Sequence, residues 1–339
     1  MKVFNMGLKV CTTFVLFSLV VPHASASQDE YEVSAMSAEQ ALEKGRLMRA
    51  QYKNLESRVY LKQAADKDSA AGSFLYAMEL NNYKTNERTP LDTRQYLLKA
   101  GELGNRRAMY QLYRHTDWLR KVDVNFWRSQ YYTSVILLGR DKPAQAMYEL
   151  ARFHRDYDEE LSSYYLDKAI EFKHPLALME RADSLVDRDG STVLSGEISD
   201  KAESLYLLAA ETEYIPAMKR YIEVLESTGR YEDAYQWRER ALQNGDITSL
   251  AVMAKILIGQ SSNYSFVPSD KVTAKAYMDL YLSSAGRERM TSLYSVISND
   301  EELLSLTINA EEKEQALDIY LKFKKTVNFY NHDKFWDIQ

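Results

Sequence analysis

The sequence predicts an all-α fold, a right-handed α-solenoid of about seven helix-turn-helix repeats. Only 12 of its 339 residues are Gly and 6 are Pro, a composition that favours helices joined by short turns. Similar segments recur roughly every 36 residues, a period that is typical of stacked helical hairpins. Each copy also pairs a large residue with a small one four positions later, which places both on one helix face.

Residues 1–26 have the features of an export signal. Lys2 and Lys9 precede an apolar run from Val10 to Val21, and the small-x-small triplet Ala24-Ser25-Ala26 follows it. The run is shorter than a comfortable membrane span, so we expect cleavage after Ala26 and a periplasmic or secreted mature chain. An uncleaved membrane anchor is the alternative.

Cleavage also changes the composition of the mature chain. Cys11 lies before the apolar run and is expected to leave with the signal, so the mature chain would have no cysteine and no disulfide. Loss of Lys2 and Lys9 from the 43 basic residues leaves 41 against 49 acidic ones. A chain this acidic is not expected to bind nucleic acid.

Residues 27–35 are predicted to form a flexible leader before the first helix. The segment Ser37-Ala-Glu-Gln40 has the pattern of a capping box, in which the side chains at both ends satisfy backbone N–H groups at a helix start. The first helix is therefore expected to begin just after Ser37.

The repeats are predicted to occupy residues 36–297. Their anchors are Tyr60-Leu-Lys-Gln-Ala64, Tyr96-Leu-Leu-Lys-Ala100, Tyr131-Tyr-Thr-Ser-Val135, Tyr165-Leu-Asp-Lys-Ala169, Leu205-Tyr-Leu-Leu-Ala209 and Trp237-Arg-Glu-Arg-Ala241, with a fainter copy over 276–296.

Within one copy, apolar residues from Leu91 to Leu103 follow the helical period, and Gly104 is placed to end that helix. A small residue, such as Ala108, stands eight positions after the anchor alanine Ala100. Small residues on both helices allow close packing of each hairpin, and neighbouring hairpins must stack to bury their apolar faces.

Three segments resemble Sel-1-like repeats, relatives of the tetratricopeptide repeats. The turn regions 99–108 and 168–177 and the first helix at 200–210 carry the resemblance, which extends over roughly residues 40–296. It implies a helical-hairpin scaffold that binds other proteins. The sequence departs from the family where the usual second-helix Gly is replaced, for example by Ala77 and Tyr113, and the turn Gly is kept only at Gly104 and Gly245.

The C-terminal segment 298–339 is predicted to form capping helices. Ser298-Asn-Asp-Glu301 could begin one helix, and Glu311–Phe329 has the pattern of an amphipathic helix. The longest loops are expected at Val186–Asp200 and Gly259–Asp270, where insertions would protrude from the solenoid.

No catalytic, cofactor or metal site is predicted. The four histidines outside the signal have no metal-ligand spacing; they are His115, His154, His174 and His332. The stretch Asp187-Arg-Asp-Gly190 resembles a calcium loop but lacks the acids that such a loop needs before and after its Gly. Charge runs such as 158–160 and 311–314 are interpreted as solvated helix starts, although paired carboxylates could serve glycoside hydrolysis.

Aromatic and arginine side chains are the best candidates for a binding surface. One aromatic residue per repeat, namely Tyr60, Tyr96, Tyr131, Tyr165 and Trp237, is expected to pack between hairpins. Neighbouring positions are predicted to line a concave face that binds a partner, because Tyr and Arg dominate interaction surfaces; these are Arg94, Arg128, Tyr164, Tyr206, Tyr235, Arg238, Tyr277 and Tyr281.

The sequence therefore favours a non-enzymatic interaction scaffold of the bacterial cell envelope, with a protein partner and no cofactor. Three alternatives stay open. By analogy with exported repeat proteins, the chain could assemble or regulate surface polysaccharide export, close to polysaccharide or peptidoglycan machinery. It could instead be a virulence-associated binder of a host protein, or a cell-wall hydrolase.

Overall fold

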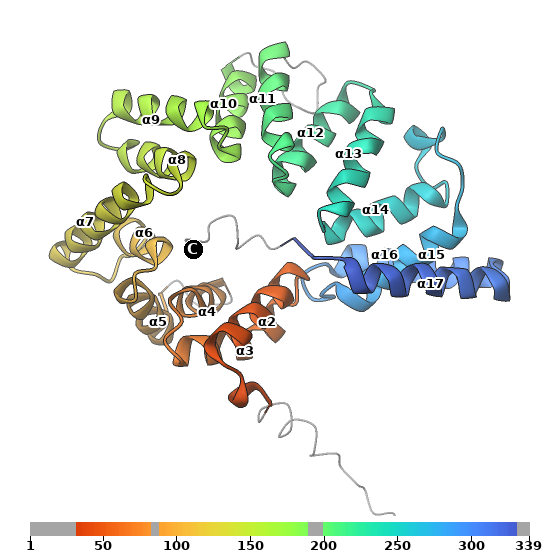
Figure 1. Ribbon diagram of the computed structural model, residues 1–339, viewed down its shortest axis with the longest axis horizontal. Coiled ribbons are helices and arrows are strands. Elements are labelled where there is room, and N and C mark those ends of the chain that lie inside the picture. The colour runs from red at the N-terminus through yellow and green to blue at the C-terminus, as the bar shows by residue number, and fades with distance from the viewer. Residues whose placement is uncertain (1–31, 83–87, 189–198, 331–339) are drawn as a thin grey trace, which may run out of the picture. The chain divides into compact units, whose positions relative to one another are not determined.

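The computed structural model describes residues 32–82, 88–188 and 199–330 of the chain (Figure 1). These residues are divided between two compact units, residues 1–35 and residues 36–339. The predicted signal segment 1–26 lies outside the described residues. In the second unit the helices are α2 (Ala38–Ala50), α3 (Asn54–Asp66), α4 (Ala70–Asn82), α5 (Leu91–Glu102), α6 (Arg106–Arg114), α7 (Lys121–Leu138), α8 (Pro143–His154), α9 (Glu159–Glu171), α10 (Pro175–Arg188), α11 (Asp200–Glu211), α12 (Ile215–Ser227), α13 (Tyr231–Gln243), α14 (Ile247–Leu257), η2 (Ser262–Tyr264), α15 (Lys271–Ser284), α16 (Thr291–Thr307) and α17 (Ala310–Thr326).

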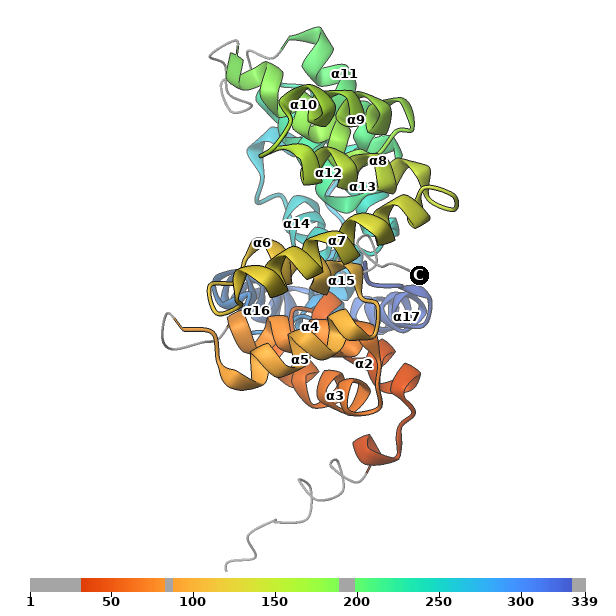
Figure 2. The same cartoon turned by 90° about the vertical axis from the view of Figure 1, so that its left-hand side faces the viewer.

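The second unit is built from helical hairpins, as predicted. In the described part of the chain, the helices from α3 to α16 pair in order into seven hairpins, and each helix packs on the next one (Figures 1 and 2). Helix α2 precedes the first hairpin, and α17 packs on α15. The all-α solenoid prediction is confirmed, while its right-handed sense remains a prediction.

Small residues form the seam inside each hairpin. Ala100 and Ala108 are fully buried where α5 meets α6, and the equivalent pairs Ala169 with Ala177 and Ala209 with Ala217 are at most 1% exposed. In the first hairpin Gly72 replaces the second alanine, and a methyl group there would lie 2.7 Å from Cβ of Ala64. The two backbones can approach this closely only because the facing residues are small.

The turns between paired helices share one geometry. Gly104 and Gly245 have positive φ angles of 88° and 87°, as expected for glycines that end a helix. Lys173 and Glu213 hold the equivalent position with φ angles of 56° and 64°. The turn geometry of Gly104 and Gly245 is therefore kept where a residue with a side chain replaces the glycine, although a side chain in this left-handed region costs about 1 kcal/mol.

The N-terminal capping box of the second unit is confirmed. The Ser37 hydroxyl accepts a hydrogen bond from the Gln40 backbone, and the Gln40 side chain accepts one from the Ser37 backbone. None of the helices that the structure describes is both long and apolar enough to span a membrane.

The C-terminal helices differ in part from the prediction. The helix start expected at Ser298 is wrong, because α16 begins at Thr291 and runs through that position. The predicted boundary between repeats and cap therefore falls inside a helix. Helix α17 begins one residue earlier than expected, with a capping box on Asn309, and ends at Thr326. Beyond it the backbone N–H of Tyr330 donates to the carbonyl oxygen of Gly245 at 2.9 Å.

Candidate functional site

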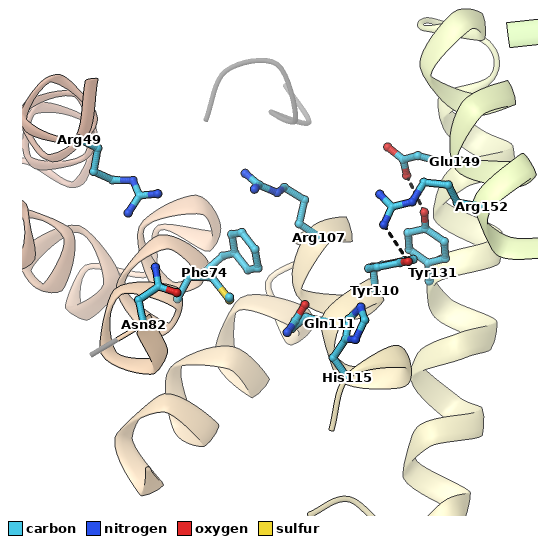
Figure 3. Close-up of a pocket in the computed structure, with 11 residues that line it drawn as sticks. Arg49, Phe74, Asn82, Arg107, Tyr110, Gln111, His115, Tyr131, Glu149 and Arg152 are labelled. Atoms are coloured by element: carbon cyan, nitrogen blue, oxygen red, sulfur yellow. Dashed lines mark hydrogen bonds between the residues drawn. The ribbon is translucent and has the colours of Figure 1, made fainter. Parts of the chain in front are cut away.

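Helices of the first three hairpins enclose a pocket of about 350 Å³, called here the arginine pocket (Figure 3). The second helices α4, α6 and α8 supply most of its wall, with contributions from α2 and α7. Its lining residues are Arg49, Phe74, Met78, Asn82, Arg107, Tyr110, Gln111, His115, Tyr131, Glu149 and Arg152.

Two arginines of the pocket lie over aromatic rings. The guanidinium carbon of Arg107 is 4.7 Å from the centre of the Phe74 ring. That of Arg152 is 4.6 Å from the centre of the Tyr110 ring, and Arg152 Nη2 donates a hydrogen bond to the Tyr110 hydroxyl at 2.8 Å. Contacts of this kind attract the guanidinium to the face of the ring and limit where the side chain can lie.

Glu149, the one carboxylate in the lining, is buried and bound on several sides. Arg106 donates to both of its oxygens, from Nε at 2.7 Å and from Nη2 at 3.2 Å. The Tyr131 hydroxyl and the Gln145 amide donate further hydrogen bonds at 3.1 and 2.9 Å. Burial, followed by the nearby Glu149 charge, raises the pKa of Tyr131 well above its ordinary value, so Tyr131 stays a donor. Glu149 is thus a structural anion whose charge Arg106 balances from outside the lining.

The remaining polar residues of the pocket come from three elements. Arg49 of α2 forms an ion pair with Glu79, which is fully buried and also accepts a hydrogen bond from Asn54 at 2.8 Å. Burial, with Arg114 and Arg152 nearby, lowers the pKa of His115 below its ordinary value, which keeps that imidazole neutral at pH 7. Gln111 adds an amide that can both donate and accept.

The lining therefore combines three arginines, of which Arg49 is paired with Glu79, with one glutamate that is paired with Arg106, in a chain whose formal charge is −6. It does not supply a pair of carboxylates for acid and base catalysis, since Glu149 is held by Arg106. Among the residues that the structure describes, no group of His, Cys, Asp or Glu is arranged to hold a metal ion.

The eight residues predicted from the sequence all lie on the first helices of hairpins, and none lines the arginine pocket. Tyr206 and Tyr281 have no exposed surface, so the prediction that they line an open face is wrong. The Tyr206 hydroxyl donates to Asp183 at 2.5 Å, an internal contact between hairpins. Both side chains pack between helices. The sequence of one repeat does not show this, because neighbouring hairpins cover further sides of the first helix.

Three other predicted residues contact neighbouring side chains of the same unit. Arg238 forms a 2.5 Å ion pair with Glu226 and a 3.1 Å hydrogen bond to the Tyr264 hydroxyl. Tyr235 lies beside the Tyr264 ring, and Tyr277 is in edge contact with Phe323. Arg238 and Tyr235 thus join α13 to α12 and η2, and Tyr277 joins α15 to α17.

Arg94, Arg128 and Tyr164 are the remaining three. Arg94 lies over the Trp118 ring and donates to the Thr89 carbonyl at 3.0 Å. Arg128 lies over Tyr157 at 3.8 Å and lines a second, shallow pocket with Tyr132, Phe153 and His154. Tyr164 is 54% exposed. The structure does not bring the three together.

The aromatic residues that were expected to pack between hairpins are not all equally buried. Tyr131 is buried, whereas Tyr96, Tyr165 and Trp237 are half-buried and pack against the apolar core clusters. Tyr131 alone of this column reaches the arginine pocket.

Sequence reasoning missed the second helices as a source of site residues. A signal was present in α6 and its C-cap, where Arg107, Gln111 and His115 follow one another at four-residue spacing and so share one helix face. In α4 the same spacing links Phe74, Met78 and Asn82. Two such stripes on successive second helices would have indicated a shared surface.

Comparison with known proteins finds solved structures to which this chain is similar. The chain is similar to a Sel1 repeat protein from Oxalobacter formigenes, with 17% identity over 90% of each chain and a TM-score of 0.37. It is also similar to a protective antigen of uropathogenic Escherichia coli that displays an SLR fold, with 16% identity and a TM-score of 0.32. That match covers 91% of this chain and 61% of the antigen. No family model and no curated protein matches the sequence.

Proposed function

We propose that this chain is a non-enzymatic interaction scaffold of the cell envelope, and that the arginine pocket holds a segment of its protein partner. The observation that carries the proposal is the convergence of side chains from five helices on one pocket, with Arg107 and Arg152 held in place by aromatic rings. Side chains that are already held by neighbours lose less entropy on binding, which favours recognition. The export signal predicted for residues 1–26 supports the envelope location.

The proposal is tested with the mature chain, residues 27–339, as bait for an envelope extract of its own cell. The double variant Arg107→Ala with Arg152→Ala is expected to capture at least tenfold less partner, because both guanidiniums are removed from one wall of the pocket. The matched control is Tyr164→Ala, which changes an exposed side chain on a first helix. Circular dichroism of each variant checks that the helices are intact.

The proposal would be overturned if the arginine variant captured as much partner as the natural chain and Tyr164→Ala captured none. In that case the first helices would carry the partner. Capture that is lost with the arginine variant and kept with the tyrosine control supports it.

A further inference from the structure

The two ends of the solenoid meet within the second unit, at a contact called here the joint. The turn between α2 and α3, residues 51–53, lies against the connection between α15 and α16 (Figure 1). The backbone N–H of Gly286 donates a hydrogen bond to the carbonyl oxygen of Gln51 at 2.6 Å, and Lys53 Nζ lies 3.5 Å from the carbonyl oxygen of Ser283. In an open solenoid each repeat contacts only its neighbours, so a contact between the first and last hairpins closes this one.

Gly286 leaves no room for a side chain at the joint. It is buried, and a methyl group on it would overlap the carbonyl oxygen of Tyr52 and lie 2.8 Å from the backbone nitrogen of Lys53. Both neighbours are backbone atoms, which cannot rotate away as the end of a flexible side chain can. A larger residue at position 286 must therefore push the α2–α3 turn away.

Tyr52 is the side chain that crosses the joint. Its φ angle is 60°, a left-handed conformation that is unusual for a bulky residue. Its ring packs against a core cluster whose other members, in the described part of the chain, all lie at position 182 or beyond. Strained backbone of this kind persists only where the surrounding contacts stabilise it. Tyr52 therefore ties the first hairpin to the core of the C-terminal half.

Charged residues from two further segments lie near Tyr52. Burial raises the pKa of Tyr52 above its ordinary value, the charge of Asp246 in the α13–α14 turn raises it further, and Arg289 partly opposes the change. The hydroxyl therefore stays protonated at neutral pH, and the ring can be buried without a charge. The joint thus depends on packing of a neutral side chain.

The joint is small compared with the packing inside the solenoid. Successive helices pack on one another as elements, whereas among the described residues α2 and α3 do not pack along α15 or α16. One turn, one backbone hydrogen bond and one aromatic side chain make most of the contact. A contact of this size can open locally while the hairpins stay folded.

The middle of the solenoid has the thinnest core. The buried residues of one large cluster lie within residues 61–153, and those of the other lie within residues 182–308. Between them, α9 and the start of α10 contribute to small clusters that include Ala169 and Leu178. Ala169 is the one buried side chain that α9 supplies. The two halves can therefore move about this hairpin with little loss of packing.

We propose that the second unit is a closed ring with a reversible joint, in which Tyr52 and Gly286 form a latch and the α9–α10 hairpin is the hinge. This inference goes beyond the proposed function, because it concerns how the scaffold opens and not what its arginine pocket holds.

The test measures distances between pairs of spin labels in the mature chain by double electron–electron resonance. The only cysteine of the sequence, Cys11, lies in the segment 1–26, so labels attach only to cysteines that are introduced. Glu56→Cys with Glu288→Cys places labels on two residues that line the same crevice at the joint. The chain with its natural latch is expected to give one short, narrow distance for this pair.

Two reference pairs report on the halves of the ring. Glu56→Cys with Glu102→Cys lies within the N-terminal half, and Gln243→Cys with Glu288→Cys lies within the C-terminal half; all four positions are exposed. Movement about the α9–α10 hairpin changes the distance across the joint and leaves both reference distances as they are.

Tyr52→Gly removes the side chain of the latch and suits the left-handed turn. It is expected to shift the distance across the joint to longer values and to broaden it, with both reference distances unchanged. Gly286→Val should have the same effect, because it displaces the turn. The matched control is Lys173→Gly, which changes an exposed residue with a φ angle of 56° at the equivalent turn position and should change none of the three distances.

A short, narrow distance across the joint that persists in Tyr52→Gly would overturn the latch. A long, broad distance in the chain with its natural latch would overturn the closed ring, and a change in either reference distance would overturn the hinge at α9–α10. If circular dichroism shows that Gly286→Val has lost its helices, Tyr52→Gly decides the matter, since glycine is favourable in that turn.

Discussion

Replacing Glu149 by leucine is expected to lower the free energy of unfolding by about 3–5 kcal/mol, because it strands a buried cation. Arg106 is only 3% exposed and donates two hydrogen bonds to Glu149 at 2.7 and 3.2 Å. The substitution also removes the acceptor of the Tyr131 hydroxyl and of the Gln145 amide. Urea unfolding followed by circular dichroism measures the loss.

The control for Glu149→Leu is the double variant Arg106→Met with Glu149→Leu. It removes both charges together, so most of the lost stability should return. As a matched surface variant, Asp123→Ala breaks the exposed pair with Arg120 and should change stability little. Equal losses for the single and the double variant would show that packing volume, and not the stranded charge, decides the effect.

Acidification from pH 7 to pH 5 is expected to cost about 2 kcal/mol of stability through His174 alone. Burial lowers the pKa of His174 from 6.5 to about 4. The unfolded chain therefore binds a proton on this residue below pH 6.5, and the folded chain does so only near pH 4. The stabilisation is complete above pH 6.5 and is lost as the pH falls from there toward 4. Urea unfolding at a series of pH values measures it.

His174→Phe separates this titration from all other acid effects. His174 stacks on Tyr148 with ring centres 4.5 Å apart, and phenylalanine keeps a ring there without a titrating group. Between pH 7 and pH 5 the variant should lose about 2 kcal/mol less stability than the natural chain. Parallel stability curves for the two proteins over this range would contradict the assignment to His174.

Much of the fold could be predicted because it depends on local pattern. The helix expected from Leu91 to just before Gly104 is α5, and the Ser37 capping box and the positive φ of Gly104 follow from residues within four positions of each other. The alanine seam could also be predicted, since small residues that recur at one fixed spacing on two helices indicate close backbone packing. Ser298 shows the limit of local signals, because its cap pattern lies within the continuous helix α16.

The candidate site could not be predicted to the same extent. A repeat pattern shows which positions are small or aromatic, but the angle between successive hairpins decides which helix faces stay open. Tyr164 precedes its anchor Tyr165, whereas Tyr206 follows its anchor Leu205, so the two lie on different faces of their first helices. Tyr206 is fully buried and Tyr164 is 54% exposed. Arg107 and Glu149 are 42 residues apart, and only the stacking of two hairpins brings them into one wall.

Site-specific photo-crosslinking to the envelope partner tests most directly whether the arginine pocket is the binding site. A benzophenone amino acid is placed at Gln111, which lines the arginine pocket on α6, or at Tyr164, which is exposed on α9. A partner segment held in the pocket should give crosslinks from position 111 and none from position 164. Crosslinks from position 164 with none from position 111 would contradict a partner site in the arginine pocket.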